Sequence, residues 1–227
     1  MKKGIFLIFR LSIIIMLGLP IFSDINAQEL KRYEFETAYA EKISTTNSSG
    51  VEVTKTETIY VSDFGNKEIH FINEKRKINM MGQNINEENN TVSIIDGDWI
   101  ISYDTDKKTG TKIKLNMNEN LSGLSEGNLK KMAEQMGDAM NTEITGLGTE
   151  DLNGKSCKVT QAVTDLMGMK TTSKTWTYKN FVMKSESSGM GSDISETVTK
   201  FQEGVTVDPK MFNIPSDIEI KEVKSPY

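Results

Sequence analysis

Hydrophobic and polar residues alternate along most of the chain, the pattern of half-buried β-strands. The first such stretch runs from Tyr33 to Tyr39. The same period predicts further strands at 51–61, 68–73, 91–95, 99–103, 111–117, 154–163, 170–178, 181–187, 192–201 and 218–223. Turn residues separate them, and Asp96-Gly97 marks the clearest hairpin because Asp-Gly readily adopts positive φ angles. The spacing predicts a mainly β (α+β) fold built on an antiparallel sheet or partial barrel, with the polar stretch 84–90 as a hairpin tip.

The pattern changes to a helical period between Ser125 and about Met140. Apolar residues recur there at intervals of three and four, at Leu129, Met132, Met136 and Met140. This spacing predicts an amphipathic helix with a methionine-bearing stripe. Methionine side chains are flexible and polarisable, so the stripe has two interpretations: core filler, or a surface that accepts apolar ligands of variable shape.

The first 27 residues have the plan of a signal peptide. Basic residues Lys2, Lys3 and Arg10 accompany an apolar run from Ile5 to Leu19, and a small residue, Ala27, closes the polar stretch that follows. We expect cleavage after Ala27, leaving residues 28–227 as a single periplasmic domain with no stable membrane span. An uncleaved anchor is the alternative, and secretion beyond the outer membrane stays open.

Composition excludes several classes of function. A net charge of −5 argues against nucleic-acid binding, and the single Cys and single His exclude a disulfide framework and a multi-His metal centre. No cofactor or metal is expected. His70 lies between Ile69 and Phe71 and is predicted to face solvent, opposite to both. A Cys157–His70 nucleophilic pair is conceivable, but nothing marks the thiol as activated, so we predict a free, partly buried structural cysteine and no enzyme activity.

Three stretches in the C-terminal half resemble a known family. They are the run from Gly148 to Lys158, the Trp176 strand followed by Phe181–Lys184, and the segment from Val207 to Pro215. In this order they resemble motifs of exported bacterial domains of unknown function, which are similar to the periplasmic lipoprotein carriers LolA and LolB. The resemblance implies a strongly curved antiparallel sheet forming an unclosed barrel of about eleven strands. It also implies helical segments across the concave face, which binds acyl chains in that family.

Three hypotheses about function follow. The chain is a non-catalytic envelope protein that binds an apolar ligand such as a lipid or a lipoprotein acyl chain. Alternatively, it is a structural or protein-interaction module of the envelope with a filled interior and a protein partner. The third hypothesis is a hydrolase or redox protein that uses Cys157. For the first hypothesis, parity and helical period select eight ligand-facing residues: Phe35, Phe71, Trp99, Ile101, Met132, Met136, Met140 and Trp176.

Overall fold

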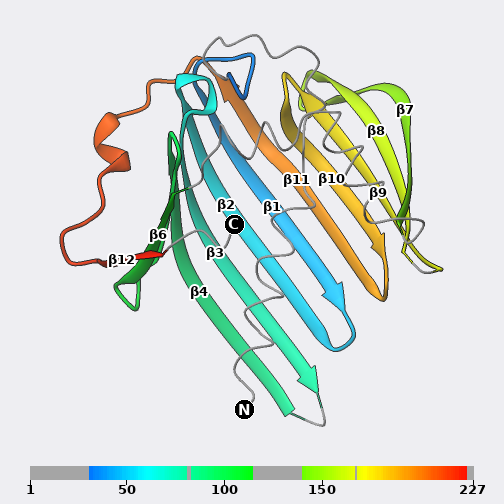
Figure 1. Cartoon of the computed structure of the whole chain (residues 1–227), viewed down its shortest axis with the longest axis horizontal. Coiled ribbons are helices and arrows are strands. Elements are labelled where there is room, and N and C mark those ends of the chain that lie inside the picture. The colour runs from blue at the N-terminus through cyan, green and yellow to red at the C-terminus, as the bar shows by residue number, and fades with distance from the viewer. Residues whose placement is uncertain (1–30, 81–82, 115–139, 167, 224–227) are drawn as a thin grey trace.

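A computed structural model of the chain describes residues 31–80, 83–114, 140–166 and 168–223. These residues form one twelve-stranded sheet (Figure 1). The strands are β1 (Ala38–Ser48), β2 (Val51–Ser62), β3 (Lys67–Met80), β4 (Gln83–Asp96), β5 (Trp99–Asp104), β6 (Thr109–Lys114), β7 (Met140–Leu152), β8 (Lys155–Leu166), β9 (Met169–Tyr178), β10 (Phe181–Gly189), β11 (Ser192–Glu203) and β12 (Glu219–Val223). Two 3₁₀ turns, η1 (Asp63–Gly65) and η3 (Pro209–Phe212), interrupt the connections.

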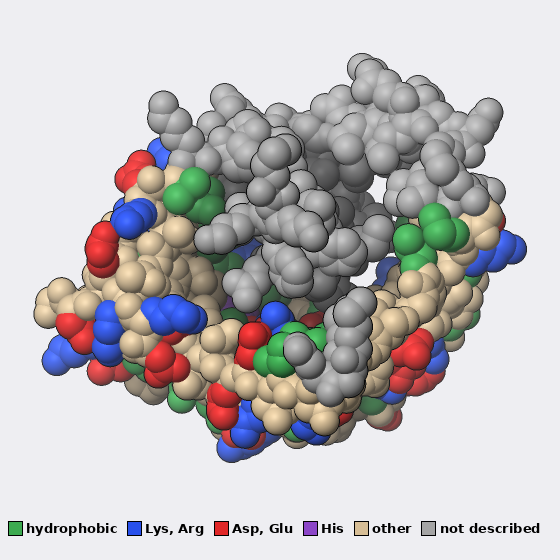
Figure 2. All heavy atoms as spheres, turned by 90° about the horizontal axis from the view of Figure 1, so that it is seen from below, with side chains coloured by type: hydrophobic (Ala, Val, Ile, Leu, Met, Phe, Trp, Pro, Cys, Tyr) green, Lys and Arg blue, Asp and Glu red, His purple; other side chains and the backbone are tan. Residues whose placement is uncertain are grey.

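The sheet is open and bent. Its order is β12-β6-β5-β4-β3-β2-β1-β11-β10-β9-β8-β7, and every neighbouring pair is antiparallel except β12 with β6, which is parallel. Because β12 and β7 are its two edges, the sheet does not close into a barrel. The strands splay and curve in Figure 1, and the described residues form a curved wall in Figure 2. The mainly β, unclosed architecture predicted from the sequence is therefore confirmed.

The two faces of the central strands carry different residues. Side chains alternate between faces along each strand, and directly paired residues share a face. Ile59 pairs with His70, and Val61 pairs with Glu68, so these four residues share one face, which we call the His70 face. Ile69 pairs with Ile94, and Phe71 pairs with Val92, on the opposite face, the Phe71 face.

The larger hydrophobic core includes the apolar residues of the His70 face on β1 and β2. It brings together residues from the N-terminal segment and from β1, β2 and β8–β11, among them an aromatic group: Phe35, Ala38, Ala40, Ile59, Val61, Cys157, Val159, Trp176, Phe181, Met183, Val198 and Phe201. Small side chains at Ala38 and Ala40 leave room for the larger ones, and the Phe35 ring lies 5.5 Å from that of Phe201. Aromatic residues bury large apolar areas, so this group dominates the core.

A second, smaller core lies on the Phe71 face of β3, β4 and β5. It contains Ile69, Val92, Ile94, Ile101, Tyr103 and Ile218. The C-terminal segment covers it, since Met211, Phe212 and Ile214 pack against the same cluster. In Figure 1 this segment runs beside β6 at one side of the molecule before β12 joins the sheet. Both chain ends of the described region thus cover apolar residues of the sheet.

The N-terminal segment is not the strand that its alternation predicted. Residues 32–36 form bends, and β1 begins at Ala38. The backbone N–H of Tyr33 donates to Phe64 O, and that of Glu34 donates to Lys179 O, so these amides bond to connecting turns. The alternating aromatic residues therefore reflect packing onto the core instead of strand pairing.

Of three other expectations about local structure, one is confirmed and two are wrong. The Asp96-Gly97 hairpin is confirmed, with Asp96 paired to Trp99 and Gly97 at a φ of 56°. The prediction that residues 84–90 form a hairpin tip is wrong, because these residues belong to β4 and pair with β3. The predicted helix is wrong at its end, because Met140 begins strand β7 and pairs with Leu166. Its other residues, including Met132 and Met136, lie outside the described part of the chain.

We predict that the second core contributes strongly to stability. Ile94→Ala removes a side chain that is only 1% exposed and should lower the free energy of unfolding by about 2–5 kcal/mol. Ile85→Ala, on the same strand but 44% exposed, should change it by less than about 0.5 kcal/mol. Urea denaturation of both variants checks this, and equal effects would contradict the assignment of the core.

Candidate functional site

A groove lies on the sheet where the Phe71 face extends beyond the C-terminal segment. Its volume is about 580 Å³, and it is open to solvent along one side. Strands β1 to β4 supply most of its lining, with additions from β11 and from the turn after β5: Tyr39, Glu41, Lys42, Ile43, Thr56, Glu57, Thr58, Phe71, Ile72, Asn73, Asn90, Thr91, Val92, Thr105 and Thr199. A groove of this size falls within the range of small-molecule sites.

Exposed apolar side chains form part of the groove. Ile43 on β1 is 43% exposed, and Phe71 on β3 is 39% exposed, so both present apolar surface to solvent. Tyr60 lies beside them, with its ring 5.1 Å from that of Tyr39 and 6.5 Å from that of Phe71. The three aromatic rings make a continuous row across β1, β2 and β3. This row provides a rigid apolar platform at the site.

Most of the remaining lining is polar, and several of its groups are already bonded. Asn73 Nδ2 donates to Asn90 Oδ1 at 2.9 Å, while Asn90 Nδ2 donates to Asp106 Oδ2 at 3.1 Å. The Tyr39 hydroxyl donates to Glu41, and this hydrogen bond raises the pKa of Tyr39 to about 12. The groove therefore combines an apolar floor with a fixed polar rim.

Among the predicted ligand-facing residues whose side chains the structure describes, Phe71 alone lines this groove. Phe35 and Trp176 are buried in the larger core, and Ile101 is buried in the second core, where each packs against other side chains of the protein. That they contact a ligand stays a prediction.

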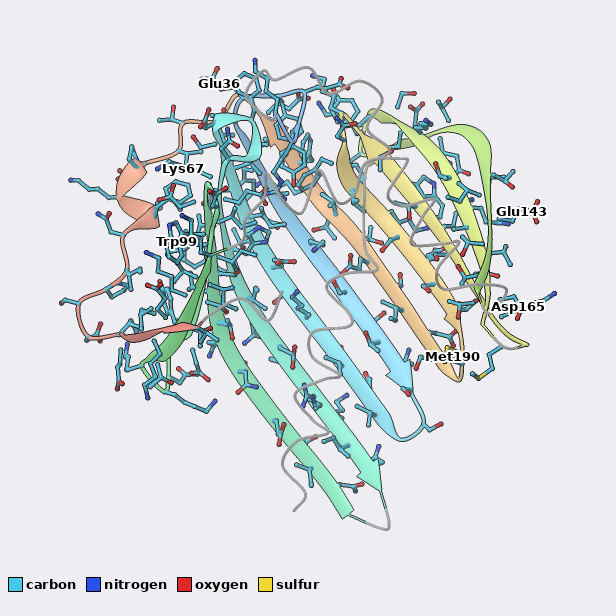
Figure 3. The ribbon with its side chains drawn as sticks, in the orientation of Figure 1. Glu36, Lys67, Trp99, Glu143, Asp165 and Met190 are labelled. Carbon is cyan, nitrogen blue, oxygen red and sulfur yellow. The ribbon has the colours of Figure 1, made fainter. Side chains whose placement is uncertain are left out.

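The remaining predicted residues are spread over the sheet. Trp99 on β5 is half-buried beneath Lys112 Nζ, which lies 3.8 Å from the ring centroid. Figure 3 shows Trp99 on one side of the molecule, with Glu143 of β7 and Asp165 of β8 on the other. Trp99 and β7, where Met140 lies, are thus not brought together. Met132 and Met136 lie outside the described residues.

A buried cluster of charges occupies the His70 face. His70 lies between two carboxylates: Nδ1 is 2.9 Å from Glu57 Oε1, and Nε2 is 2.9 Å from Glu68 Oε2. Glu57 and Glu68 are 5% and 2% exposed. The prediction that His70 faces solvent is therefore wrong. Its side chain points away from Ile69 and Phe71, as the alternation requires, but it is only 19% exposed and both ring nitrogens contact buried carboxylates.

The second oxygen of each carboxylate contacts a cation from another element. Lys42 Nζ of β1 lies 2.8 Å from Glu57 Oε2, and Arg32 Nη1 of the N-terminal segment lies 2.7 Å from Glu68 Oε1. Burial by itself raises the pKa of a carboxyl group, but the hydrogen bonds from His70 and the nearby cations outweigh it and lower the pKa of both Glu57 and Glu68. Both carboxylates therefore remain ionised inside the protein.

The sequence contained a signal for this cluster. On β2, the residues that share the parity of Ile59 and Val61 include Lys55 and Glu57, two charges on an otherwise apolar face. Lys42 similarly follows Ala38 and Ala40 on β1. Charges at apolar parity on neighbouring strands indicate that they are buried as partners, because an unpaired buried charge is very costly.

The described residues show no arrangement of three or more His, Cys, Asp and Glu side chains that could hold a metal ion. Within the same ranges, no helix is long and apolar enough to cross a membrane. Cys157 is a free thiol in the larger core, and burial raises its pKa. The contacts of His70 are with Glu57 and Glu68, which occupy both ring nitrogens.

No family model matches the chain, and no curated protein sequence matches it. Several solved structures do. LppX from Mycobacterium tuberculosis is 12% identical over 77% of this chain and 91% of its own, with a TM-score of 0.35. A putative outer membrane lipoprotein-sorting protein domain from Vibrio parahaemolyticus is 11% identical over 80% and 92%, with a TM-score of 0.31. MucB from Pseudomonas aeruginosa, in complex with MucA, is 11% identical over 85% and 60%, with a TM-score of 0.38.

We predict that Cys157 is unreactive while the protein is folded. The thiolate is the reactive form of cysteine. The raised pKa lowers the fraction of Cys157 that is thiolate, and burial keeps the reagent away from the sulfur. Labelling with a thiol-specific disulfide reagent at pH 8 should be at least about 100-fold slower than in 6 M guanidinium chloride, since labelling requires an opening of the core. A folded protein that labels as fast as the unfolded chain would contradict this burial.

Proposed function

We propose that this chain is a non-catalytic binding protein of the cell envelope, and that the apolar part of its ligand binds in the groove on the Phe71 face. The observation that carries the proposal is the pair of exposed apolar side chains, Ile43 and Phe71, in an open groove of about 580 Å³. The signal-peptide pattern of residues 1–27 supports the location.

The groove favours a ligand with both an apolar and a polar part. Each methylene that leaves water on Ile43, Phe71 and Val92 contributes about 0.8 kcal/mol, so a lipid or acyl chain gains affinity with its length. The polar rim of Asn73, Asn90 and the threonines offers hydrogen-bonding groups to a head group. A lipid or the acyl end of a lipoprotein has this combination of parts.

The alternative function is a structural or protein-interaction module with a filled interior. The observation in its favour is that Phe35, Ile101 and Trp176 are buried among the protein's own side chains. For this module, the groove would have no affinity for lipids, and the same exposed residues would contact an envelope protein.

Ile43→Glu should weaken lipid binding. We expect the Kd for dansyl-undecanoic acid to rise about tenfold or more, because a carboxylate in the floor of the groove replaces apolar contact with charge repulsion. Fluorescence titration of the purified protein, freed of bound lipid by organic extraction, measures the Kd.

The matched control is Ile85→Glu. Ile85 has nearly the same exposure as Ile43 but does not line the groove, so the Kd should not change. If the Ile43→Glu variant binds with the same Kd as the parent protein, the ligand binds outside the groove. The absence of any saturable binding to the parent protein would instead favour the interaction module.

A further inference from the structure

The buried charge cluster connects five parts of the chain. His70 and Glu68 belong to β3, Glu57 and Lys55 to β2, and Lys42 to β1. Glu196 of β11 contacts Lys42 at 3.9 Å. The fifth part is the N-terminal segment, which contributes Arg32 and Tyr33 beside Glu68. Among the described residues, these are the charged and titratable groups around His70.

Only one member of this cluster changes its charge close to neutral pH, and it is His70. Burial lowers the pKa of the imidazole, but the hydrogen bonds and negative charges of Glu57 and Glu68 outweigh burial and raise it above the usual 6.5. When protonated, His70 donates Nδ1–H to Glu57 and Nε2–H to Glu68 at the same time. A neutral imidazole has a single N–H and can satisfy only one of the two carboxylates.

Loss of the proton therefore leaves a buried carboxylate facing a nitrogen lone pair. An ionised group that loses its partner inside a protein carries a large cost, so the cluster must admit water or rearrange. Glu57 lies on β2, between β1 and β3, and it also contacts Lys42 of β1 and Lys55 of β2. Glu68 instead depends on Arg32, whose side chain is 29% exposed and belongs to the irregular segment before β1. The N-terminal segment is thus the part of the cluster that can move away from the sheet.

We propose that the His70 cluster is a pH-sensitive clasp, which holds residues 31–37 on the sheet while His70 is protonated and loosens them when it loses its proton. The segment carries Tyr33 and Phe35, whose rings stack 5.1 Å apart over Phe181 and Phe201. Loosening the segment would uncover this aromatic group. The clasp therefore controls access to apolar surface on the larger core, independently of the groove.

The pKa shifts of His70, Glu57 and Glu68 determine how the stability of the clasp depends on pH. The raised pKa of His70 means that its contribution to stability is complete below pH 6.5 and is lost as pH rises through the folded-state value. The lowered pKa values of Glu57 and Glu68 mean that their contributions are present above pH 4.5 and are lost as pH falls. The clasp is thus tightest between about pH 4.5 and 6.5.

The first experiment is an NMR titration of the imidazole, which gives one resolved signal because the chain has a single His. We expect its midpoint above 6.5 in the folded protein. Glu57→Gln and Glu68→Gln should each move the midpoint downward, because each removes one negative acceptor. A wild-type midpoint at or below 6.5 would overturn the proposal without requiring any variant to fold.

The second experiment measures hydrogen exchange at the amides of Tyr33 and Glu34, which bond to Phe64 and Lys179. After correction for the intrinsic pH dependence of exchange, their protection should fall at least about tenfold across the His70 titration. The amide of Ile94 in β4 is the internal control and should keep its protection. A His70 that titrates as expected without any loss of protection at Tyr33 and Glu34 would show a charge cluster with no clasp.

Discussion

A single sheet has two faces, and most of the apolar surface on each face must be kept from water without a second sheet to pack against. Here the segments that flank the sheet cover apolar parts of it. Residues 31–37 pack onto the core that includes Ile59 and Val61, and the C-terminal segment packs onto Ile69 and Ile94 on the opposite face. The sheet continues beyond both covers, and the groove with Ile43 and Phe71 lies where the C-terminal segment ends its coverage. The groove is thus exposed because the C-terminal segment covers only part of the Phe71 face.

The same constraint explains the buried charges. On the His70 face, Glu68 and His70 of β3 lie beside the core residues Val61 and Ile59 of β2, and Lys42 and Glu57 lie next to the core residues of β1 and β2. Every carboxylate oxygen of Glu57 and Glu68 contacts a basic nitrogen, which is the condition under which buried charges are tolerated. A row of paired charges fixes the register of the three strands, because a slip of one residue would move each charge to the other face.

Alternation along the strands was enough to predict the sheet, since ladders such as β2 with β3 keep one register over twelve pairs. It failed where another interaction produced the same pattern. Tyr33 and Phe35 alternate with glutamates because they pack onto a core, and strand β7 was missed because its first residue, Met140, completed a helical period. Of the eight predicted site residues, Phe71 could be placed at the groove. Parity does select residues of one face, but it cannot tell which part of that face a distant segment such as 209–214 will cover.

The central claim is that the exposed apolar residues of the Phe71 face bind the apolar part of a ligand. Methyl NMR of isoleucine-labelled protein, titrated with decanoate, tests this most directly, because the described isoleucines include residues of the groove, both cores and distant strands. The account predicts saturable shifts at Ile43, with Ile59, Ile85 and Ile144 unchanged. Shifts confined to Ile59 beneath the N-terminal segment, or to none of these residues, would contradict it.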